Sequence, residues 1–198
     1  MSGRKTAGGM SYQTLEGINH INFEQLFADG NPGEIFEKKK EYYQASADKI
    51  RARLILARTR ISSIKLKESN ASYINHKISK GIRWLDKLKM NIESSQDEQE
   101  FQHAISYKQW HLVKLIPQAA EGCALSCFLE EQLKNPKNSL RKNNMENINE
   151  AGAHNQQVRN LLIEILNSDE NNNLVLQEEQ LSEAYEKLNL AYKALDKK

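Results

Sequence analysis

Apolar side chains recur every three or four residues along most of this chain, which is the repeat of an α-helix that buries one side. The clearest series lies in residues 34–68 and alternates by four and three residues: Tyr43, Ala47, Ile50, Leu54, Ala57, Ile61 and Ile64. This a/d spacing is typical of a helix in coiled-coil-like contact with a neighbour along its length. Residues 34–68 therefore predict a rod of about 50 Å.

Two further helices are expected directly after this one. Asn70 or Ser72 is a candidate N-cap for the second helix, because both side chains can accept hydrogen bonds from free amides. Ser95 and Glu98 match a capping box that opens the third. That third helix contains Pro117, which lacks an amide donor, so we expect the helix to be kinked or split there.

The Asn-rich segments 134–144 and 167–173 separate this part from a fourth and a fifth helix. No strand-length window alternates apolar and polar residues convincingly, and the chain has only 3 prolines and 9 glycines in 198 residues. The predicted fold is therefore all-α, an up-down bundle of four to five long helices. Residues 1–32 are predicted to be a flexible tail with a possible short helix, and 33–198 a single bundle domain.

Charge is divided unevenly along the chain, although the net charge is only +2. Residues 33–90 contain 15 Lys and Arg against 6 Asp and Glu, a balance of +9, whereas residues 91–198 contain 11 against 17, a balance of −6. On the heptad of the 34–68 helix, the basic residues fall on two edges beside the buried seam. One edge has Arg51, Arg58 and Lys65, and the other has Arg53, Arg60 and Lys67.

These basic edges have two interpretations. In the first, they are solvated flanks of a central bundle helix, with long stems covering apolar neighbours. In the second, they bind an anionic partner, either a nucleic acid or an acidic protein surface, because no facing helix offers an obvious acidic complement. Ile55, Leu56 and Leu66 lie on the back of the same helix and predict a protein interface, with a partner or a second copy.

No catalytic, cofactor-binding or metal-binding residue is predicted, so we expect a non-enzymatic interaction or structural protein with no small-molecule substrate. Cys123 and Cys127 are one helical turn apart, poorly placed for a disulfide and too few for a zinc site. His103 and His111 are separated by about 12 Å on a helix, too far to share a metal. A regulatory role for the thiols or the histidines is left open.

The compartment is constrained only by the absence of targeting patterns. No run of 18 or more apolar residues occurs, so membrane insertion is not expected. The N-terminal "MSGRKTAGGM" lacks the apolar region of a secretory signal, which makes a cytoplasmic location the default. A secreted or cell-surface location is the alternative if the chain is a processed fragment. Asn70-Ala71-Ser72 matches the N-glycosylation pattern in that case.

The segment of residues 70–116, beginning "NASYINHKISKGIRWLDKLK", has an Asn-small-Ser cap that opens a helix after a long basic one. In this it is similar to the repeated helical hairpins of uncharacterised archaeal cell-surface and secreted proteins. The resemblance implies helical hairpins and an extracellular setting, and no activity is attached to it.

Overall fold

The protein is helical throughout the part that the computed structural model describes, which comprises residues 31–105, 107–134, 145–168 and 174–196. No strand occurs in these ranges, so the all-α prediction is confirmed. The predicted tail, residues 1–32, lies almost entirely outside them. The described helices are α2 (Pro32–Ser62), α3 (Glu68–Ser94), α4 (Glu98–Ala104), α5 (Tyr107–Leu133), α7 (Met145–Asn167) and α8 (Leu174–Asp196).

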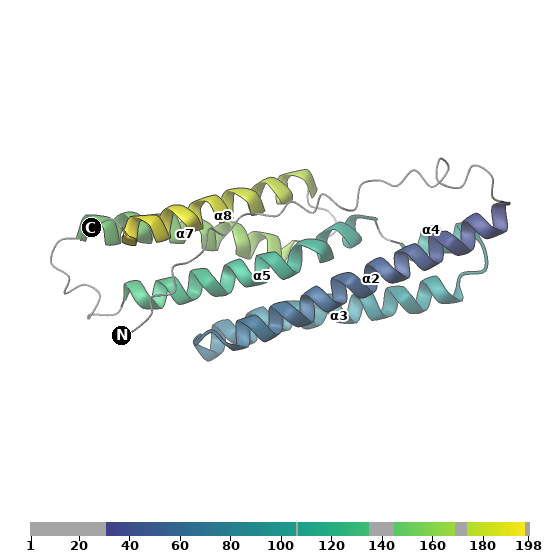
Figure 1. Ribbon diagram of the computed structural model, residues 1–198, viewed down its shortest axis with the longest axis horizontal. Helices are drawn as coiled ribbons and strands as arrows, with labels where there is room; N and C mark the ends of the chain where they lie inside the picture. The colour runs from purple at the N-terminus through teal and green to yellow at the C-terminus, as the bar shows by residue number, and fades with distance from the viewer. Residues whose placement is uncertain (1–30, 106, 135–144, 169–173, 197–198) are drawn as a thin grey trace, which may run out of the picture.

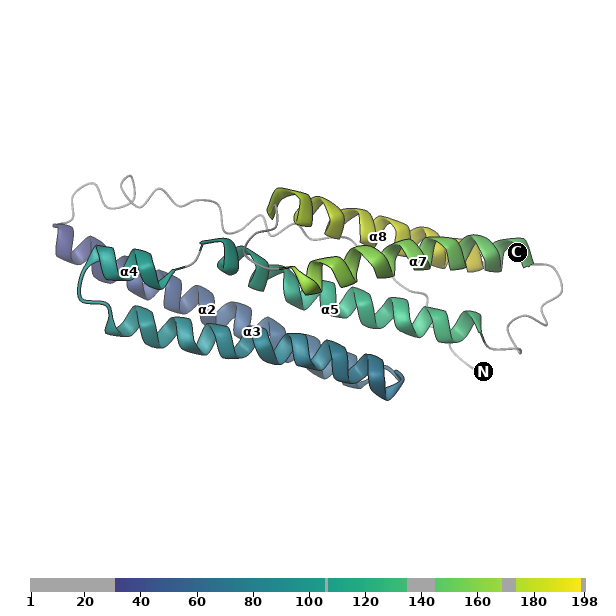
Figure 2. The same ribbon diagram turned by 180° about the vertical axis from the view of Figure 1, so that it is seen from behind.

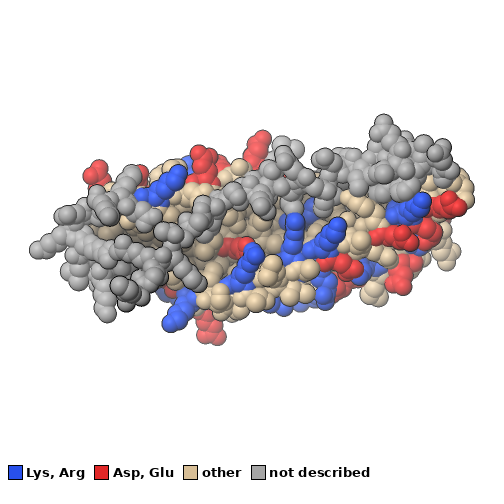
Figure 3. Space-filling model, in the orientation of Figure 1, with Lys and Arg blue, Asp and Glu red and all other residues tan. Residues whose placement is uncertain are grey.

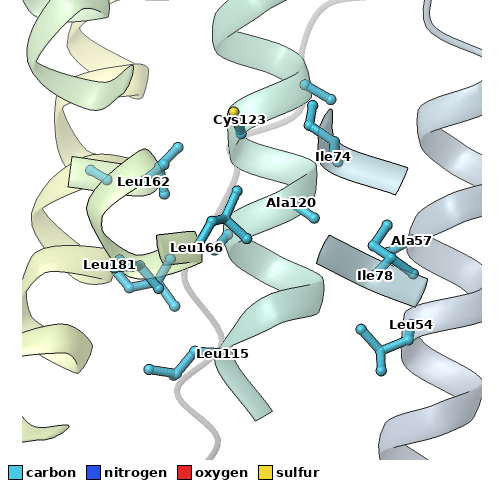
Figure 4. Packing of buried hydrophobic residues seen from close by; sticks show 14 of the residues in the cluster. Leu54, Ala57, Ile74, Ile78, Leu115, Ala120, Cys123, Leu162, Leu166 and Leu181 are labelled. Carbon is cyan, nitrogen blue, oxygen red and sulfur yellow. The ribbon is translucent and has the colours of Figure 1, made fainter. Parts of the chain in front are cut away.

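Two helical hairpins flank α5, which runs between them (Figures 1 and 2). One hairpin is α2 with α3, and the other is α7 with α8. The helix α5 packs against all four of these helices, whereas short α4 lies over one end of the first hairpin. Figure 4 shows the result in section, with Leu115 and Cys123 of α5 between Ile78 of α3 and Leu162 of α7. The central helix is thus α5, and the long basic helix occupies a flank.

The seam predicted from periodicity lies in this core. In α3, a series with the same spacing of four and three residues is buried, namely Ile74, Ile78, Gly81, Leu85, Leu88 and Ile92. In α2, the fully buried positions include Ala47, Leu54 and Ala57. Tyr43 and Ile64, at the two ends of the α2 seam, are partly buried and pack against the core. Helical spacing therefore identified the buried side of α2 correctly.

The third predicted helix is split into two, α4 and α5. The prediction that a split would fall at Pro117 is wrong, because the break lies upstream of it. The chain leaves helical geometry at Ile105, with φ −96° and ψ 95°, and α5 then continues through Pro117. Proline removes only one hydrogen bond of the helix ladder, and Pro117 lies among buried residues on both sides, such as Leu115 and Ala119. Packing on both sides of α5 keeps the helix continuous there.

An aromatic cluster explains why the break lies upstream. The ring of Tyr43 lies 5.6 Å from the Phe101 ring and 5.6 Å from the Trp110 ring. On one continuous helix, two residues nine positions apart would point in opposite directions about 13 Å apart along the axis. Both can reach the same tyrosine only if the helix is broken between them. The interruption at Ile105 therefore allows α4 and α5 each to bury an aromatic side chain against α2.

Local hydrogen bonds set the ends of α2 and α3 differently from the expectation. Asn31 caps α2, accepting from the Glu34 amide at 3.0 Å with Pro32 in the first turn. The helix ends at Ser62 rather than residue 68, where the Ser63 hydroxyl donates to the Arg60 carbonyl at 2.6 Å. The next helix begins at Glu68, ahead of both expected caps, and its N-cap residue makes no side-chain capping bond.

Two glycines bring α5 close to its neighbours. A Cβ atom on Gly81 of α3 would lie 3.3 Å from both Leu54 and Ile116, and one on Gly122 of α5 would lie 3.0 Å from Leu162. These distances are shorter than ordinary van der Waals contact, so a side chain at either position would force the neighbouring leucine or isoleucine to shift. By contrast, a Cβ on Gly152 of α7 would meet no atom within 4 Å.

We expect Gly122→Val to lower the free energy of unfolding by about 1–3 kcal/mol, because the added methyl groups would push α5 and α7 apart. Gly152→Ala is the matched control and should raise it by about 0.5–1 kcal/mol through helix propensity alone. Urea unfolding followed by circular dichroism measures both values. Equal stability of Gly122→Val and the wild type would contradict the close contact of α5 with α7.

Candidate interaction surface

Three of the six basic residues singled out on α2 and the following loop use their side chains in hydrogen bonds or ion pairs within the chain. The Arg51 Nε donates to Asp86 Oδ1 of α3 at 2.9 Å. The Arg60 Nη1 donates to Glu121 Oε1 of α5 at 3.1 Å. The remaining bonded residue, Arg58, donates from Nη2 to Ser79 Oγ at 2.8 Å, while its Nε is buried without a hydrogen bond to any described residue.

These bonds correct the expectation that the basic edges lack an internal complement. The same kind of contact recurs where Lys89 Nζ of α3 lies 2.6 Å from Asp48 Oδ1 of α2. Ion pairs of exposed side chains contribute little stability individually, about 0–1 kcal/mol. Their effect here is to fix the lengthwise register of the α2/α3 hairpin and to neutralise part of its charge.

The other three basic residues differ in environment. Arg53 is exposed on α2 and makes no ion pair or hydrogen bond with any residue that the structure describes. Lys65 is exposed in the loop between α2 and α3, so the predicted edge does not continue to it as a helix. Lys67 donates its backbone amide to Glu131 Oε1 at 3.1 Å. Its side chain belongs to a charged cluster described below.

The apolar residues predicted as an interface also separate into two kinds. Ile55 and Leu56 are 42% and 48% exposed, on the side of α2 away from its buried seam. Leu66 is partly buried and packs against the core at the α2/α3 turn. Only Ile55 and Leu56 are therefore available on the outer face of α2.

Leu56 lies within a continuous basic surface, which we call the α2 stripe and define as Lys49, Arg53, Leu56 and Arg60. These residues are spaced by four, three and four, and lie within about 60° of one another around the helix axis. All four are exposed, including Arg60, whose side chain is 60% accessible despite its bond to Glu121. In Figure 3, Lys and Arg side chains line this flank of α2 with acidic side chains between them. Lys49 is at neither of the two heptad edges that border the buried seam, so the heptad pattern did not point to it.

A second charged cluster joins the end of α5 and the start of α3 to the middle of α7. Glu130 of α5 pairs with Lys134 one turn later and with Arg159 of α7. Glu131 accepts from the backbone of Lys67 at the start of α3. A hollow between these helices is lined by the same side chains together with Ser69 and Asn70. The hydrogen bond from Lys134, followed by the Arg159 charge, holds the pKa of Glu130 below its usual range.

This cluster is a structural junction that depends on pH. Because the pKa of Glu130 is lower in the folded chain than in the unfolded one, its stabilisation is complete above the unfolded value of about 4.3. It is lost as pH falls through the folded pKa. We expect Glu130→Gln to lower the melting temperature at pH 7, and this effect to shrink as the pH falls below about 4.3, measured by thermal unfolding. Glu93→Gln is the matched control, because Glu93 is exposed and makes no ion pair with a described residue. It should leave the melting temperature unchanged at pH 7 and at low pH. A Glu130→Gln effect of the same size at every pH would show that the charge of Glu130 does not supply the stabilisation.

Cys123 and Cys127 are unoxidised and buried in the core, each 2% exposed. Their thiols hydrogen-bond to each other across one turn of α5. This bond, together with burial, raises the pKa of the Cys123 thiol, and the same bond lowers the pKa of Cys127. The absence of a disulfide agrees with the four-residue spacing.

The histidines of the third predicted helix do not come together. His103 is exposed on α4, and His111 lies on α5 with Nδ1 4.0 Å from Glu178 Oε1 of α8. The helix break at Ile105 separates them. Among the described residues, no three His, Cys, Asp or Glu side chains are grouped so that they could hold a metal ion.

Lys114 is a buried charged residue that sequence analysis did not single out. It is 9% exposed, and its Nζ lies 5.4 Å from the centre of the Trp110 ring. Burial lowers the pKa of this amine, and the contact with the ring compensates part of the cost of desolvation. In the sequence, the position of this lysine within the apolar run "HLVKLI" is the pattern that would have indicated its burial.

Comparison with known proteins yields no match to a family model, to a curated protein or to a solved structure. One segment of the described chain, Glu98–Leu133, is long and apolar enough to cross a membrane by length and composition. In the structure, 67% of its most apolar window is buried against other helices. A helix at the centre of a bundle meets the same criterion, so this segment is explained by its place in the core.

Proposed function

We propose that the chain is a non-enzymatic protein-interaction module that uses the α2 stripe and neighbouring Ile55 to bind an acidic, partly apolar helical surface. The observation that carries this proposal is the exposure of Leu56 within a group of three basic side chains. An isolated exposed leucine is ordinary, but one surrounded by cations is suited to a partner of opposite charge with an apolar centre.

The apolar and the basic side chains would contribute to such binding in different ways. Burial of Leu56 and Ile55 supplies affinity, because apolar surface removed from water stabilises the complex. The cations supply orientation and a faster association rate, since opposite charges steer the encounter. One helix face buries less area than a standard interface, so we expect a transient complex whose affinity falls with salt.

Several features favour a protein over a nucleic acid as the partner. Arg51 and Arg60 already make ion pairs with carboxylates, which reduces the charge available to phosphates. A leucine at the centre of the α2 stripe would gain little from a phosphate backbone. In addition, no aromatic residue that could stack on a base lies within the stripe.

The test uses a fluorescein-labelled amphipathic peptide built from about three heptads of Leu and Glu. We expect it to bind the full chain at low salt, measured by fluorescence anisotropy. The double variant Arg53→Glu with Leu56→Asp should weaken binding by about tenfold or more, because it removes a charge pair and the apolar contact.

Arg83→Glu on α3 is the matched control, since Arg83 is also exposed and makes no bond with a described residue. It should change the affinity by less than about twofold. Equal weakening by both variants would mean that net charge alone attracts the peptide. Tighter binding of a duplex DNA or RNA of similar length, lost in the same double variant, would assign the surface to nucleic acid instead.

A further inference from the structure

The outer face of α8 has the opposite chemistry to the α2 stripe. Its exposed positions form a second surface, the α8 stripe, which consists of Leu176, Glu179, Glu183, Glu186 and Leu190. The spacing of three, four, three and four keeps these residues within about 80° around the helix axis. The two leucines are 48% and 38% exposed and stand at the ends of the three glutamates. In Figure 3, acidic side chains stand along the upper edge, where α8 runs.

The glutamates of the α8 stripe are largely unused within the chain. Glu183 lies 3.6 Å from Lys187 one turn later, and its side chain is still 52% exposed. Glu179 and Glu186 are exposed and have no ion pair or hydrogen bond with any described residue. Arg53 and Lys49 of the α2 stripe are likewise unpaired among the described residues. Each stripe thus presents charges that the other could neutralise.

The two stripes are complementary in pattern as well as in sign. The α2 stripe places one leucine among three basic side chains, and the α8 stripe places three acidic side chains between two leucines. When the two helices lie side by side, Leu56 can contact either leucine of α8 while the charges face each other. Opposite charges flanking an apolar contact are the arrangement that determines pairing in helical assemblies.

The two stripes cannot meet within one chain. The α8 stripe lies on the side of its helix away from the core, and the α2 stripe lies on a flank of α2, where Arg60 bonds Glu121 of α5. The helices α2 and α8 belong to hairpins separated by α5 (Figure 1). We therefore propose that the α8 stripe of one copy docks on the α2 stripe of a second copy. This inference rests on the proposed function, because it names the partner of the same α2 surface.

Such a contact is heterologous, since different surfaces of the two copies meet. A pair formed in this way retains one free α2 stripe and one free α8 stripe, so further copies can add unless the geometry closes into a ring. The ion pairs are exposed and individually contribute little. We expect association that requires high protein concentration and decreases as salt rises.

The experiment is sedimentation velocity of the full chain at concentrations up to about 1 mM, at about 50 mM and 500 mM salt. Two variants are compared with the wild type: Lys49→Gln with Arg53→Gln, and Glu179→Gln with Glu186→Gln. None of these four residues bonds to a described residue, so the fold should be unchanged, which circular dichroism checks. The wild type should associate at low salt, and the association should weaken by about tenfold or more in either variant.

Mixing the two variants gives the sharpest result. The Lys49/Arg53 variant retains only its α8 stripe, and the Glu179/Glu186 variant retains only its α2 stripe. The mixture should therefore form a one-to-one pair to which no further copies add. A monomeric wild type, or association that survives the Glu179/Glu186 change, would overturn the inference. If the Leu/Glu peptide still binds α2 in that case, the proposed function stands and only the identity of the partner is wrong. Failure of both experiments would reject both proposals.

Discussion

The helix α5 has apolar residues around its whole circumference, so it needs neighbours on every side. The structure meets this need with two hairpins, and Leu115 and Ala124, which point to opposite sides of α5, are both nearly inaccessible. Neither hairpin could cover α5 alone. The remaining features of the fold follow from this requirement, including the glycines that permit close approach and the helix break that positions the aromatic cluster.

Polar contacts with α5 define how its neighbours are aligned. The Ser126 hydroxyl donates to Asn155 Oδ1 of α7 at 2.8 Å, and the Asn155 amide donates to the Ser126 carbonyl at 3.0 Å. Both residues are buried, so a shift of one helix along the other would leave two polar groups without partners, at a cost of about 1–3 kcal/mol each. On the opposite side, Glu121 receives Arg60. These contacts specify one register among several that apolar packing alone would tolerate.

The same arrangement explains where interaction surfaces are available. Each hairpin directs one side toward α5, so the outer faces of α2 and α8 are left to solvent. The basic first part of the chain therefore exposes its charge on α2, and the acidic second part exposes its charge on α8. Internal ion pairs neutralise much of the basic hairpin, and the residues beyond their reach, Lys49 and Arg53 above all, remain available to a partner.

Periodicity in the sequence was sufficient for the fold class and for the buried side of α2, because burial repeats with the helical period. Tertiary contacts were not accessible in this way. The break at Ile105 depends on two aromatic rings sharing Tyr43, and the Arg51–Asp86 pair depends on the alignment of α2 with α3. The α8 stripe lies on the outward positions of its helix, which a pattern of buried apolar residues does not indicate. Listing the outward positions of each helix would have revealed it.

Native-state hydrogen exchange measures most directly whether α5 is the shared centre of the structure. If α5 is the shared centre, the amides of residues 112–129 exchange only through global unfolding and have the slowest exchange in the chain. Parts of both hairpins should open separately at lower free energy. If the α2/α3 or α7/α8 hairpin remained protected after the amides of α5 had exchanged, the hairpins would be stable without it. That result would show that α5 is not the shared centre of the structure.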